Sequence, residues 1–484
     1  MTTMSRSLPG RPPVKPASLY ADRMKVYPQR IGGTFRRFKW AVLAVLLALY
    51  YLVPWIRWNR GPGAPDQAVL IDMPGRRAYF LFIEIWPQEI YYLVGLLVMA
   101  AIGLFLVTSV AGRVWCAFTC PQTVWTDLFM LVERWIEGDR NARMKLDHSS
   151  FSPEKLGKKS AKHAVWLLIA GLTGGAWIMY FNDAPTVVRR IFAGEASIAV
   201  YGFVGLFTAT TYLLAGWARE QFCIYMCPWP RFQSAMFDEH SWLVTYETWR
   251  GEPRGHAKAG QSFEGRGHCI DCGLCVCVCP TGIDIRNGQQ LACIGCGLCI
   301  DACNSVMRKI GLPPNLITYD SIANQEARGR GAAPRRHLMR ARTIAYACVL
   351  LVVAGVMTVA LWSRPTMAVS AQPDRAPLFV TLSDGSIRNG YTLKIINKSR
   401  AARNYRLTAE GPLDASLSVI GYLERDASAA VLPVAPDSVA TFRVLVHAAR
   451  DRAASPTTAL TFVAIDTATG EASRDRTVFH APAR

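Results

Sequence analysis

The stretch from residue 269 to residue 303 reads CIDCGLCVCVCPTGIDIRNGQQLACIGCGLCIDAC and contains the spacing C-x2-C-x2-C-x3-C twice. This is the bacterial ferredoxin pattern for two [4Fe–4S] clusters, in which the fourth cysteine of each run ligates the other run's cluster. Zinc sites use C-x2-C pairs with longer gaps, so zinc fits the run poorly. The pattern predicts one cluster on Cys269, Cys272, Cys275 and Cys303, and a second on Cys279, Cys293, Cys296 and Cys299.

The composition around this run is that of a membrane protein with basic loops. Of the 484 residues 51% are apolar, and the formal net charge is +19, which argues against a simple soluble enzyme. All 14 cysteines lie between Cys116 and Cys348. Cys277 lies inside the first ferredoxin run but outside the ligand spacing, so we interpret it as a free buried thiol. We interpret the single Cys348 as a packing residue.

Five stretches are long and apolar enough to be membrane-spanning helices, which need roughly 20 mostly apolar residues. These runs lack charges, which disfavours buried helices of a soluble protein. Trp, Tyr and Arg cluster at several of their ends, as interfacial anchors do. The predicted spans are residues 39–56, 90–111, 164–182, 196–218 and 343–362.

Lysine and arginine are unevenly distributed between the segments that flank these spans. Residues 1–39 and 111–163 carry nine basic residues each, whereas 55–89 carry four and 183–195 carry two. The positive-inside rule therefore predicts a cytoplasmic N-terminus. In a Gram-negative bacterium, this multi-pass protein is expected in the inner membrane, with its C-terminal domain in the periplasm. The predicted order is a basic cytoplasmic segment (1–38), a four-span region (39–218), a cytoplasmic segment (219–342) containing the ferredoxin domain (about 260–310), a fifth span (343–362) and a periplasmic domain (363–484).

A second cysteine repeat lies next to two of the predicted spans. RVWCAFTCPQTVWTDLF (113–129) follows the second span and REQFCIYMCPWPRFQ (219–233) follows the fourth. Both copies of C-x3-C-P are therefore expected at the cytoplasmic edge of the membrane. A repeat in corresponding positions often marks a shared site at the repeat interface. The four thiols belong to Cys116, Cys120, Cys223 and Cys227.

The spacing within each copy limits its chemistry. Residues i and i+4 of a helix share a face with Cβ atoms about 5–6 Å apart, which is too far for a disulfide but suits half of a metal site. Pro121 and Pro228 push the preceding cysteine out of the helical region, and a thiolate is favoured at the helix N-terminus that follows. Four soft ligands suit Cu(I) or another iron–sulfur cluster. The alternative is that these cysteines are small buried residues at helix breaks.

Residues 376–484 alternate in short strand-like pieces, including LFVTLSD (378–384), GYTLKIIN (390–397) and SVATFRVLVHA (438–448). Turn residues between them give the pattern of one immunoglobulin-like sandwich. The basic segment 323–342 adjoins a span and more simply attracts anionic lipid than nucleic acid. The expected fold class is a polytopic α-helical membrane protein with an inserted cytoplasmic dicluster ferredoxin-like domain and a C-terminal all-β immunoglobulin-like domain.

These features together resemble the FixG/CcoG (RdxA) family, accessory proteins for assembly of cbb-type cytochrome c oxidases. The resemblance runs roughly from Tyr27 to the C-terminus and rests on IRWNRGPGAPDQAVLIDMP (56–74), CPQTVWTDLFMLVERWIEGDRNAR (120–143), CPWPRFQSAMFDEHS (227–241) and RGEPRG (250–255). It implies a membrane-bound iron–sulfur protein that reduces Cu(II) to Cu(I) for the copper centre of the oxidase. It also implies that the four C-x3-C-P thiols form the copper or redox site. One departure is Asn304, where the family pattern has proline after the last cysteine.

Three functions are compatible with the sequence. The first is an oxidoreductase, a cupric reductase with two [4Fe–4S] clusters, whose partners are oxidase subunits or copper chaperones. The second is a quinol-linked membrane polyferredoxin that conducts electrons, which has no obvious use for an exported β-domain. The third is a non-catalytic metal-binding assembly scaffold. Whether the electron donor is cytoplasmic or a quinol, and whether the C-x3-C-P pair holds copper or a third cluster, stays open at this point.

Overall fold

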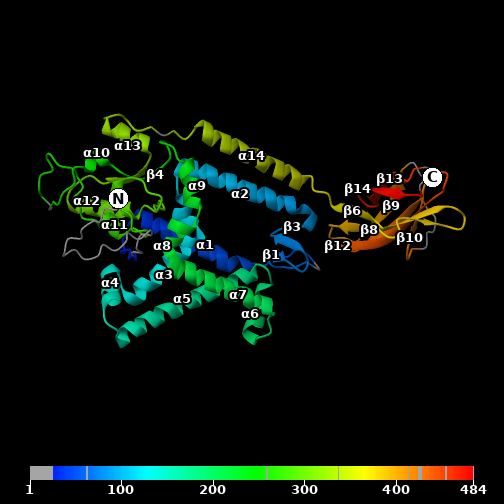
Figure 1. The fold of residues 1–484 in the computed structure, drawn as a ribbon, viewed down its shortest axis with the longest axis horizontal. Coiled ribbons are helices and arrows are strands. Elements are labelled where there is room, and N and C mark those ends of the chain that lie inside the picture. Colours follow the sequence, from blue (N-terminus) through cyan, green and yellow to red (C-terminus); the bar gives the residue numbers. More distant parts are fainter. Residues whose placement is uncertain are drawn as a thin grey trace, which may run out of the picture. The chain divides into compact units, whose positions relative to one another are not determined.

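The computed structural model describes residues 25–61, 64–257, 260–335, 337–411, 414–422, 428–452 and 455–482 (Figure 1). These residues fall into two compact units. The first comprises the described residues up to Trp58 together with Gln67–Ala354. The second comprises the described part of Asn59–Asp66 and of the chain from Gly355 onward. The first unit carries all of the sequence-predicted site cysteines.

Within the described residues, four helices are long and apolar enough to cross a membrane. In the 18-residue apolar stretch of each helix, at most 17% is buried inside the protein, so most of the side chains in these stretches lie at the protein surface. They are Thr34–Trp55 (α1, Thr34–Leu52, then η1, Val53–Trp55), Pro87–Ala111 (η2, Pro87–Glu89, then α2, Ile90–Ala111), Ile198–Met226 (α7, Ile198–Thr211; η4, Tyr212–Ala218; α8, Arg219–Gln221; η5, Phe222–Met226) and α14 (Ala341–Trp362).

The segment 164–182, predicted as a span, lies mostly within α5 (Pro153–Met179), which is not among these four helices. The first ten residues of α5, PEKLGKKSAK, include five charged side chains. Its second half packs closely beside α7, because a Cβ on Gly174 would lie only 2.6 Å from the carbonyl oxygen of Val204. Four of the five predicted spans thus have helices that are long and apolar enough to cross a membrane, and the span at 164–182 stays a prediction.

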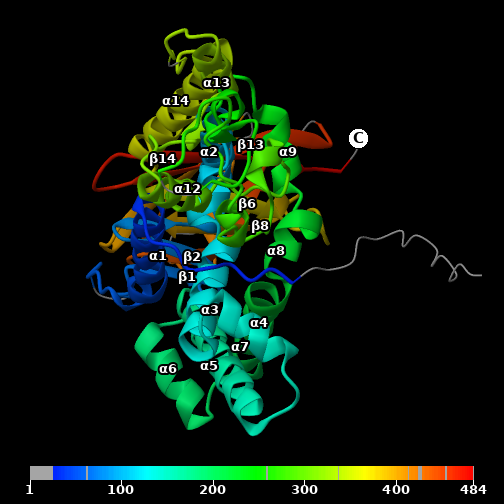
Figure 2. The ribbon, with the colours of Figure 1, turned by 90° about the vertical axis from the view of Figure 1, so that its left-hand side faces the viewer.

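Shorter elements connect these helices. They are a three-stranded antiparallel sheet of β1 (Val69–Asp72), β2 (Arg77–Phe80) and β3 (Ile83–Ile85), and the helices α3 (Pro121–Glu137), α4 (Arg140–His148), α6 (Ala184–Ala193) and α9 (Trp229–Met236). The three-stranded sheet was not expected from the sequence. The rings of Phe129 on α3 and Trp166 on α5 stack at 5.2 Å within one buried core. Figure 2 shows the first part of the described chain, in dark blue, running past α3 before it enters α1.

A two-stranded antiparallel sheet closes the ferredoxin-like region. Its strands are β4 (Leu243–Tyr246) and β5 (Ile317–Asp320), with α10 (Thr248–Gly251), α11 (Leu274–Cys277), η6 (Ile285–Asn287) and α12 (Leu298–Lys309) between them and α13 (Ile322–Gly329) after them. Helices α11 and α12 begin directly after Gly273 and Gly297, whose φ angles of 65° and 72° favour glycine. The third cysteine of each run is therefore the second residue of a helix.

The N-terminus of α1 is capped by α12. The backbone amides of Phe35 and Arg36 donate to the carboxylate of Asp301 at 3.3 and 2.8 Å. A Cβ on Gly33, which precedes the helix, would lie 2.1 Å from the Cγ atom of Asp301, so the close approach requires glycine. A carboxylate situated between two ferredoxin cysteines therefore supplies the N-terminal cap of the first membrane-length helix.

The second unit is a sandwich of two antiparallel sheets. One has the order β10 (Ser416–Val419), β12 (Ser438–Ala448), β8 (Ile387–Asn397) and β6 (Met367–Pro373), with β7 (Val380–Thr381) also paired to β8; the other has the order β11 (Ala429–Val434), β9 (Arg403–Glu410), β13 (Thr457–Asp466) and β14 (Ala472–His480). Tyr391 and Phe462 meet in the core between the sheets. The predicted sandwich is confirmed, although the piece 378–384 supplies only the short β7.

Candidate iron–sulfur and thiol site

The eight ferredoxin cysteines surround two cavities in the first unit. The thiols lining one cavity are those of Cys269, Cys272, Cys275 and Cys303. The thiols lining the other are those of Cys279, Cys293, Cys296 and Cys299, with Cys275 also at its wall. The fourth cysteine of each run thus lies with the first three of the other run, as the dicluster spacing requires. Each set of four sulfur donors within largely apolar walls fits one [4Fe–4S] cluster.

Burial shifts the pKa of several of these thiols upward. It raises the pKa of Cys275 to about 11, and that of Cys296 and Cys303 to about 12. Interactions with neighbouring thiols of the same group raise it further, as Cys275, Cys269 and Cys272 do for Cys303. Iron ligands are thiolates, so bound metal would have to offset this burial and release the protons. The described residues contain no group of three His, Cys, Asp or Glu side chains placed for a single metal ion.

The two C-x3-C-P motifs share one backbone geometry. In each, the first cysteine lies in a π-helical turn, η3 (Trp115–Thr119) or η5. The amides of Cys120 and Cys227 donate to the carbonyl oxygens five residues earlier, both at 2.8 Å. These two cysteines then leave the helical region with ψ angles of 128° and 121°, as predicted for residues before proline. The π-turns themselves were not predicted, and such turns are frequent at functional sites.

These turns bring four thiols within electrostatic range of one another. The thiol of Cys116 interacts with those of Cys120, Cys223 and Cys227. Its Sγ atom also donates a hydrogen bond to Oε1 of Gln233 at 3.3 Å. Burial raises the pKa of Cys116 to about 12, and it raises that of Cys120 although backbone amides of the next turn lower it. The amides at the helix N-terminus thus lower the pKa of Cys120, as expected, but burial outweighs them.

Arg113 joins the C-x3-C-P thiols to the second ferredoxin cavity. This side chain is 5% exposed and lies just before the first π-turn. Its Nη1 donates to the carbonyl oxygens of Leu291 and, at 2.6 Å, of Cys293, and its Nη2 donates to that of Pro230 at 3.1 Å. Burial lowers the pKa of Arg113, whereas Cys293 and Cys116 raise it. One buried cation thus lies between both sets of thiols.

Apolar packing brings the same two groups together. Phe118 of the first π-turn belongs to one buried core with Cys296 and Leu298 of the second ferredoxin run. Lys39 of α1 lies within electrostatic range of both Cys296 and Cys223. The residues around the second ferredoxin cavity are therefore packed against the turn that carries the first C-x3-C-P motif.

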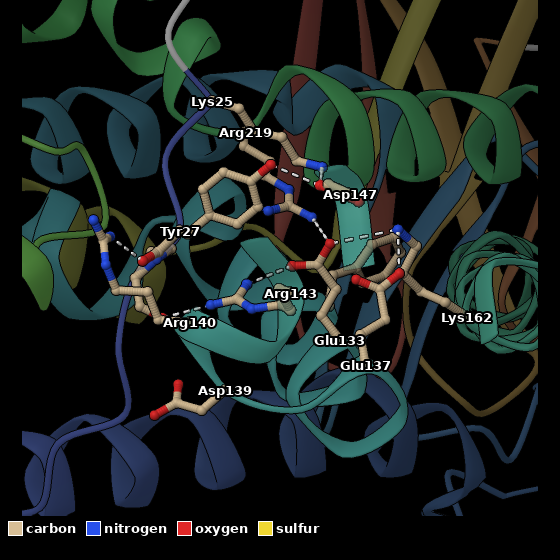
Figure 3. A network of polar contacts seen from close by, with 12 residues as sticks. Lys25, Tyr27, Glu133, Glu137, Asp139, Arg140, Arg143, Asp147, Lys162 and Arg219 are labelled. Atoms are coloured by element: carbon tan, nitrogen blue, oxygen red, sulfur yellow. Dashed lines mark hydrogen bonds and ion pairs between the residues drawn. The ribbon is translucent and has the colours of Figure 1, made fainter. Parts of the chain in front are cut away.

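A buried network of charged side chains connects the segments that carry the two C-x3-C-P motifs (Figure 3). Glu133 on α3 accepts hydrogen bonds from Arg143 on α4, at 2.9 Å, and from Arg219 on α8, at 2.5 Å. Lys162 on α5 lies 3.6 Å from Glu133 and 3.0 Å from Glu137. Burial alone would raise the pKa of Glu133, but Arg219, Lys162 and Arg143 outweigh it and hold the pKa at about 2.

Sequence reasoning missed this network. The available signal was Arg219, an ionisable side chain at the end of a predicted span, because such residues within membrane helices usually have a functional or structural partner. Its partner Glu133 lies 86 residues earlier in the chain. The two other cysteines are also placed: Cys277 lies in α11, where its carbonyl oxygen accepts from the amide of Gln29 at 2.8 Å, and Cys348 is exposed on α14.

Comparison with known proteins identifies the domains. Residues 218–322 match the family model of a 4Fe-4S dicluster domain, 93–139 that of a 4Fe-4S binding domain, and 357–482 that of the IG-like fold at the C-terminal of FixG. The chain is 48% identical to protein RdxB of Cereibacter sphaeroides over 475 residues, 97% of this chain and 98% of RdxB. It is 47% identical to the nitrogen fixation protein FixG of Rhizobium meliloti over 491 residues, 96% of this chain and 93% of FixG.

The chain belongs to the FixG family. Protein RdxA of Cereibacter sphaeroides is a further member, 48% identical over 89% of this chain and 90% of its own. A crystal structure of a FixG-related protein from Vibrio parahaemolyticus is 25% identical over 24% of this chain and 96% of that chain, with a TM-score of 0.21. The FixG family assignment confirms the resemblance drawn from the motifs. With the 4Fe-4S domains and the apolar helices, it makes this chain a membrane iron–sulfur redox protein.

Proposed function

We propose that this FixG-family protein is a cupric reductase, which transfers single electrons to Cu(II) and releases Cu(I). The clusters, when bound, supply the electrons, and one electron reduces each copper ion. The proposed ligands of the first cluster are Cys269, Cys272, Cys275 and Cys303, and those of the second are Cys279, Cys293, Cys296 and Cys299. The proposed copper site is the group of Cys116, Cys120, Cys223 and Cys227, whose thiols would have to move closer together on binding, because no three of them are placed for a single metal ion in the described structure.

The contact between the C-x3-C-P thiols and the second ferredoxin cavity carries this proposal. Phe118 and Cys296 share one buried core, and Arg113 contacts the backbone on both sides, so an electron would pass between the two groups through packed protein. Thiolates are soft ligands that favour Cu(I) over harder cations. The thiols of Cys116 and Cys120 lose their protons when they bind copper, and Gln233 accepts a hydrogen bond from Cys116 until then.

The arrangement in the membrane is part of the same proposal. We take the N-terminus and the ferredoxin domain as cytoplasmic and 363–484 as periplasmic, with 164–182 as a fifth span. This orientation places the segments rich in lysine and arginine on the cytoplasmic side of the membrane. The domain limits are those predicted from the sequence. Oxidase subunits or copper chaperones of a cbb-type cytochrome oxidase are the proposed partners, by family resemblance, with the periplasmic β-domain as the docking module.

A second candidate for the C-x3-C-P group is a third iron–sulfur cluster. The match of residues 93–139 to a 4Fe-4S binding domain favours it, because the matched segment includes Cys116 and Cys120. In that case the four thiols would conduct electrons to another acceptor, and copper would not be the substrate of this site.

A four-cysteine variant distinguishes the two. Cys116, Cys120, Cys223 and Cys227 are replaced together by alanine, and the matched control carries Cys277→Ala and Cys348→Ala. Purified, chemically reduced protein receives Cu(II), and Cu(I) is measured with a Cu(I)-specific chelator beside total iron. The proposal predicts unchanged iron and lost Cu(I) production in the four-cysteine variant alone. Loss of about four irons per chain identifies a third cluster, and Cu(I) production equal to the control's contradicts the copper site.

A further inference from the structure

A basic, aromatic groove lies between the start of α1 and the outer face of α3. Its cavity volume is about 880 Å³, within the range of about 300–1,000 Å³ typical of ligand sites. Its walls contain four arginines and two tryptophans: Arg30, Arg36, Arg37, Arg134, Trp40 and Trp135. None of these residues belongs to the cysteine sites or to the charged network around Glu133, so the proposed copper chemistry does not use the groove.

The groove has more positive charge than the protein itself neutralises. Arg36 is 6% exposed, and its Nη1 lies 3.2 Å from Asp127, a carboxylate that also binds Lys39 at 3.1 Å. Nη2 of Arg36 and Nε of Arg134 are buried without a hydrogen-bond partner. In the part of the chain described, no carboxylate lies within ion-pair distance of the guanidinium of Arg134 or of Arg37, although Asp127 and Asp139 interact with Arg134 from farther away. Among the described residues, the groove lining thus contains four guanidinium groups and no carboxylate, a charge balance that favours a bound anion.

Large exposed apolar side chains border this positive charge. Trp135 is 80% exposed and Leu131 is 41% exposed on α3, and Trp40 lies on α1 with the guanidinium of Arg36 4.3 Å from its ring centroid. From Trp40 onward α1 is apolar, and the whole helix Thr34–Trp55 is of membrane length. The charged and the apolar parts of the groove thus follow one another along the start of a membrane helix, as the headgroup and chains of a lipid do.

We propose that this groove binds the phosphodiester headgroup of an anionic phospholipid, with an acyl chain against Leu131, Trp135 and the apolar face of α1. Arginine matches a phosphate through two parallel N–H donors and is weakly hydrated, which suits it to such a site. Basic pockets between membrane helices are known to bind anionic lipid headgroups. The lipid would neutralise Arg36 and Arg134 and fix α3, which carries the first C-x3-C-P motif at its start, against the membrane surface.

The test measures lipid retention by the full-length protein with native mass spectrometry in detergent. Phosphatidylglycerol and phosphatidylcholine are titrated in parallel against wild type, against Arg37→Gln/Arg134→Gln and against Arg37→Gln alone. The matched control is Arg189→Gln/Arg190→Gln, which removes two exposed charges from α6 of the same unit. We expect wild type and control to prefer phosphatidylglycerol, the double variant to lose roughly 30-fold in affinity for it, and the single variant to lose less.

Three results would overturn the proposal. Equal retention of the two lipids by wild type would mean that the headgroup charge is not recognised. An equal loss in the α6 control would mean that only net charge matters. Displacement of phosphatidylglycerol by an equal concentration of inorganic phosphate would make free phosphate the ligand and exclude the acyl-chain contact. Cluster absorbance and iron content are measured for each variant, and the Arg37→Gln comparison decides the question if the double variant does not fold.

Discussion

Replacement of Glu133 by glutamine should destabilise the first unit strongly. The carboxylate is 2% exposed and lies against Arg143, Arg219 and Lys162. Its pKa of about 2, against an ordinary 4.5, corresponds to roughly 3 kcal/mol of stabilisation. A value of about 3–5 kcal/mol is also typical when one member of a buried ion pair is removed and the partner charges remain. Glutamine keeps the shape but leaves these cations uncompensated.

The assay is thermal unfolding in detergent at pH 7, followed by tryptophan fluorescence. We expect Glu133→Gln to lower the melting temperature by roughly 5–10 °C. The control is Glu154→Gln, whose carboxylate is exposed and pairs with Lys158 four residues later on α5, and it should have no measurable effect. Because the Glu133 pKa is depressed, its contribution is complete above about pH 5 and is lost as the pH falls toward 2. The difference between wild type and Glu133→Gln should therefore shrink in acid.

Equal melting temperatures for Glu133→Gln and Glu154→Gln would refute the reasoning. So would a difference that stays constant from pH 7 to acid, since the stabilisation is assigned to the ionised carboxylate. A variant that melts normally but loses Cu(I) production would place Glu133 in the chemistry rather than in the scaffold.

Three further predictions concern the ferredoxin-like region. Asp301→Ala removes the cap of α1 and should cost about 1 kcal/mol in thermal unfolding; a variant as stable as wild type would show that water replaces the carboxylate. Cys303→Ser should lose about four irons per chain, whereas Cys277→Ser should keep the full iron content; equal iron in both would contradict the ligand assignment. Arg113→Gln removes a buried cation beside Cys293 and should lower the reduction potential of the second cluster in an EPR redox titration, while Arg113→Lys should lower it less.

The parts of the site that the sequence predicted are those encoded by local spacing. The two ferredoxin runs determine their own turns and cysteine grouping within 35 residues, and the prolines after Cys120 and Cys227 determine where each helix breaks. The immunoglobulin-like sandwich was predicted because alternation along each strand reflects burial on one face. Local patterns were enough in these cases because the interactions that decide the structure are also local.

The rest depends on contacts between distant residues. The spacing of Cys116 and Cys120 suggested a regular helix, but the turn holds one extra residue, which only its hydrogen bonds reveal. Helix α5 begins with a charged half in which Lys162 is buried against Glu137. Hydropathy predicted only the apolar second half of this helix, because it does not register a buried ion pair. The link between Glu133 and Arg219 joins residues 86 positions apart, and no pattern in either segment reports it.

The capping of α1 by Asp301 has a consequence for the order of assembly. Asp301 lies between Cys299 and Cys303, one on each proposed cluster, so iron bound by these ligands would hold the turn of α12 that carries the carboxylate. In a chain whose clusters are not loaded, that turn would be held less firmly, and with it the cap on the first amides of α1. The state of the clusters would thereby be transmitted to the point where the first membrane-length helix begins.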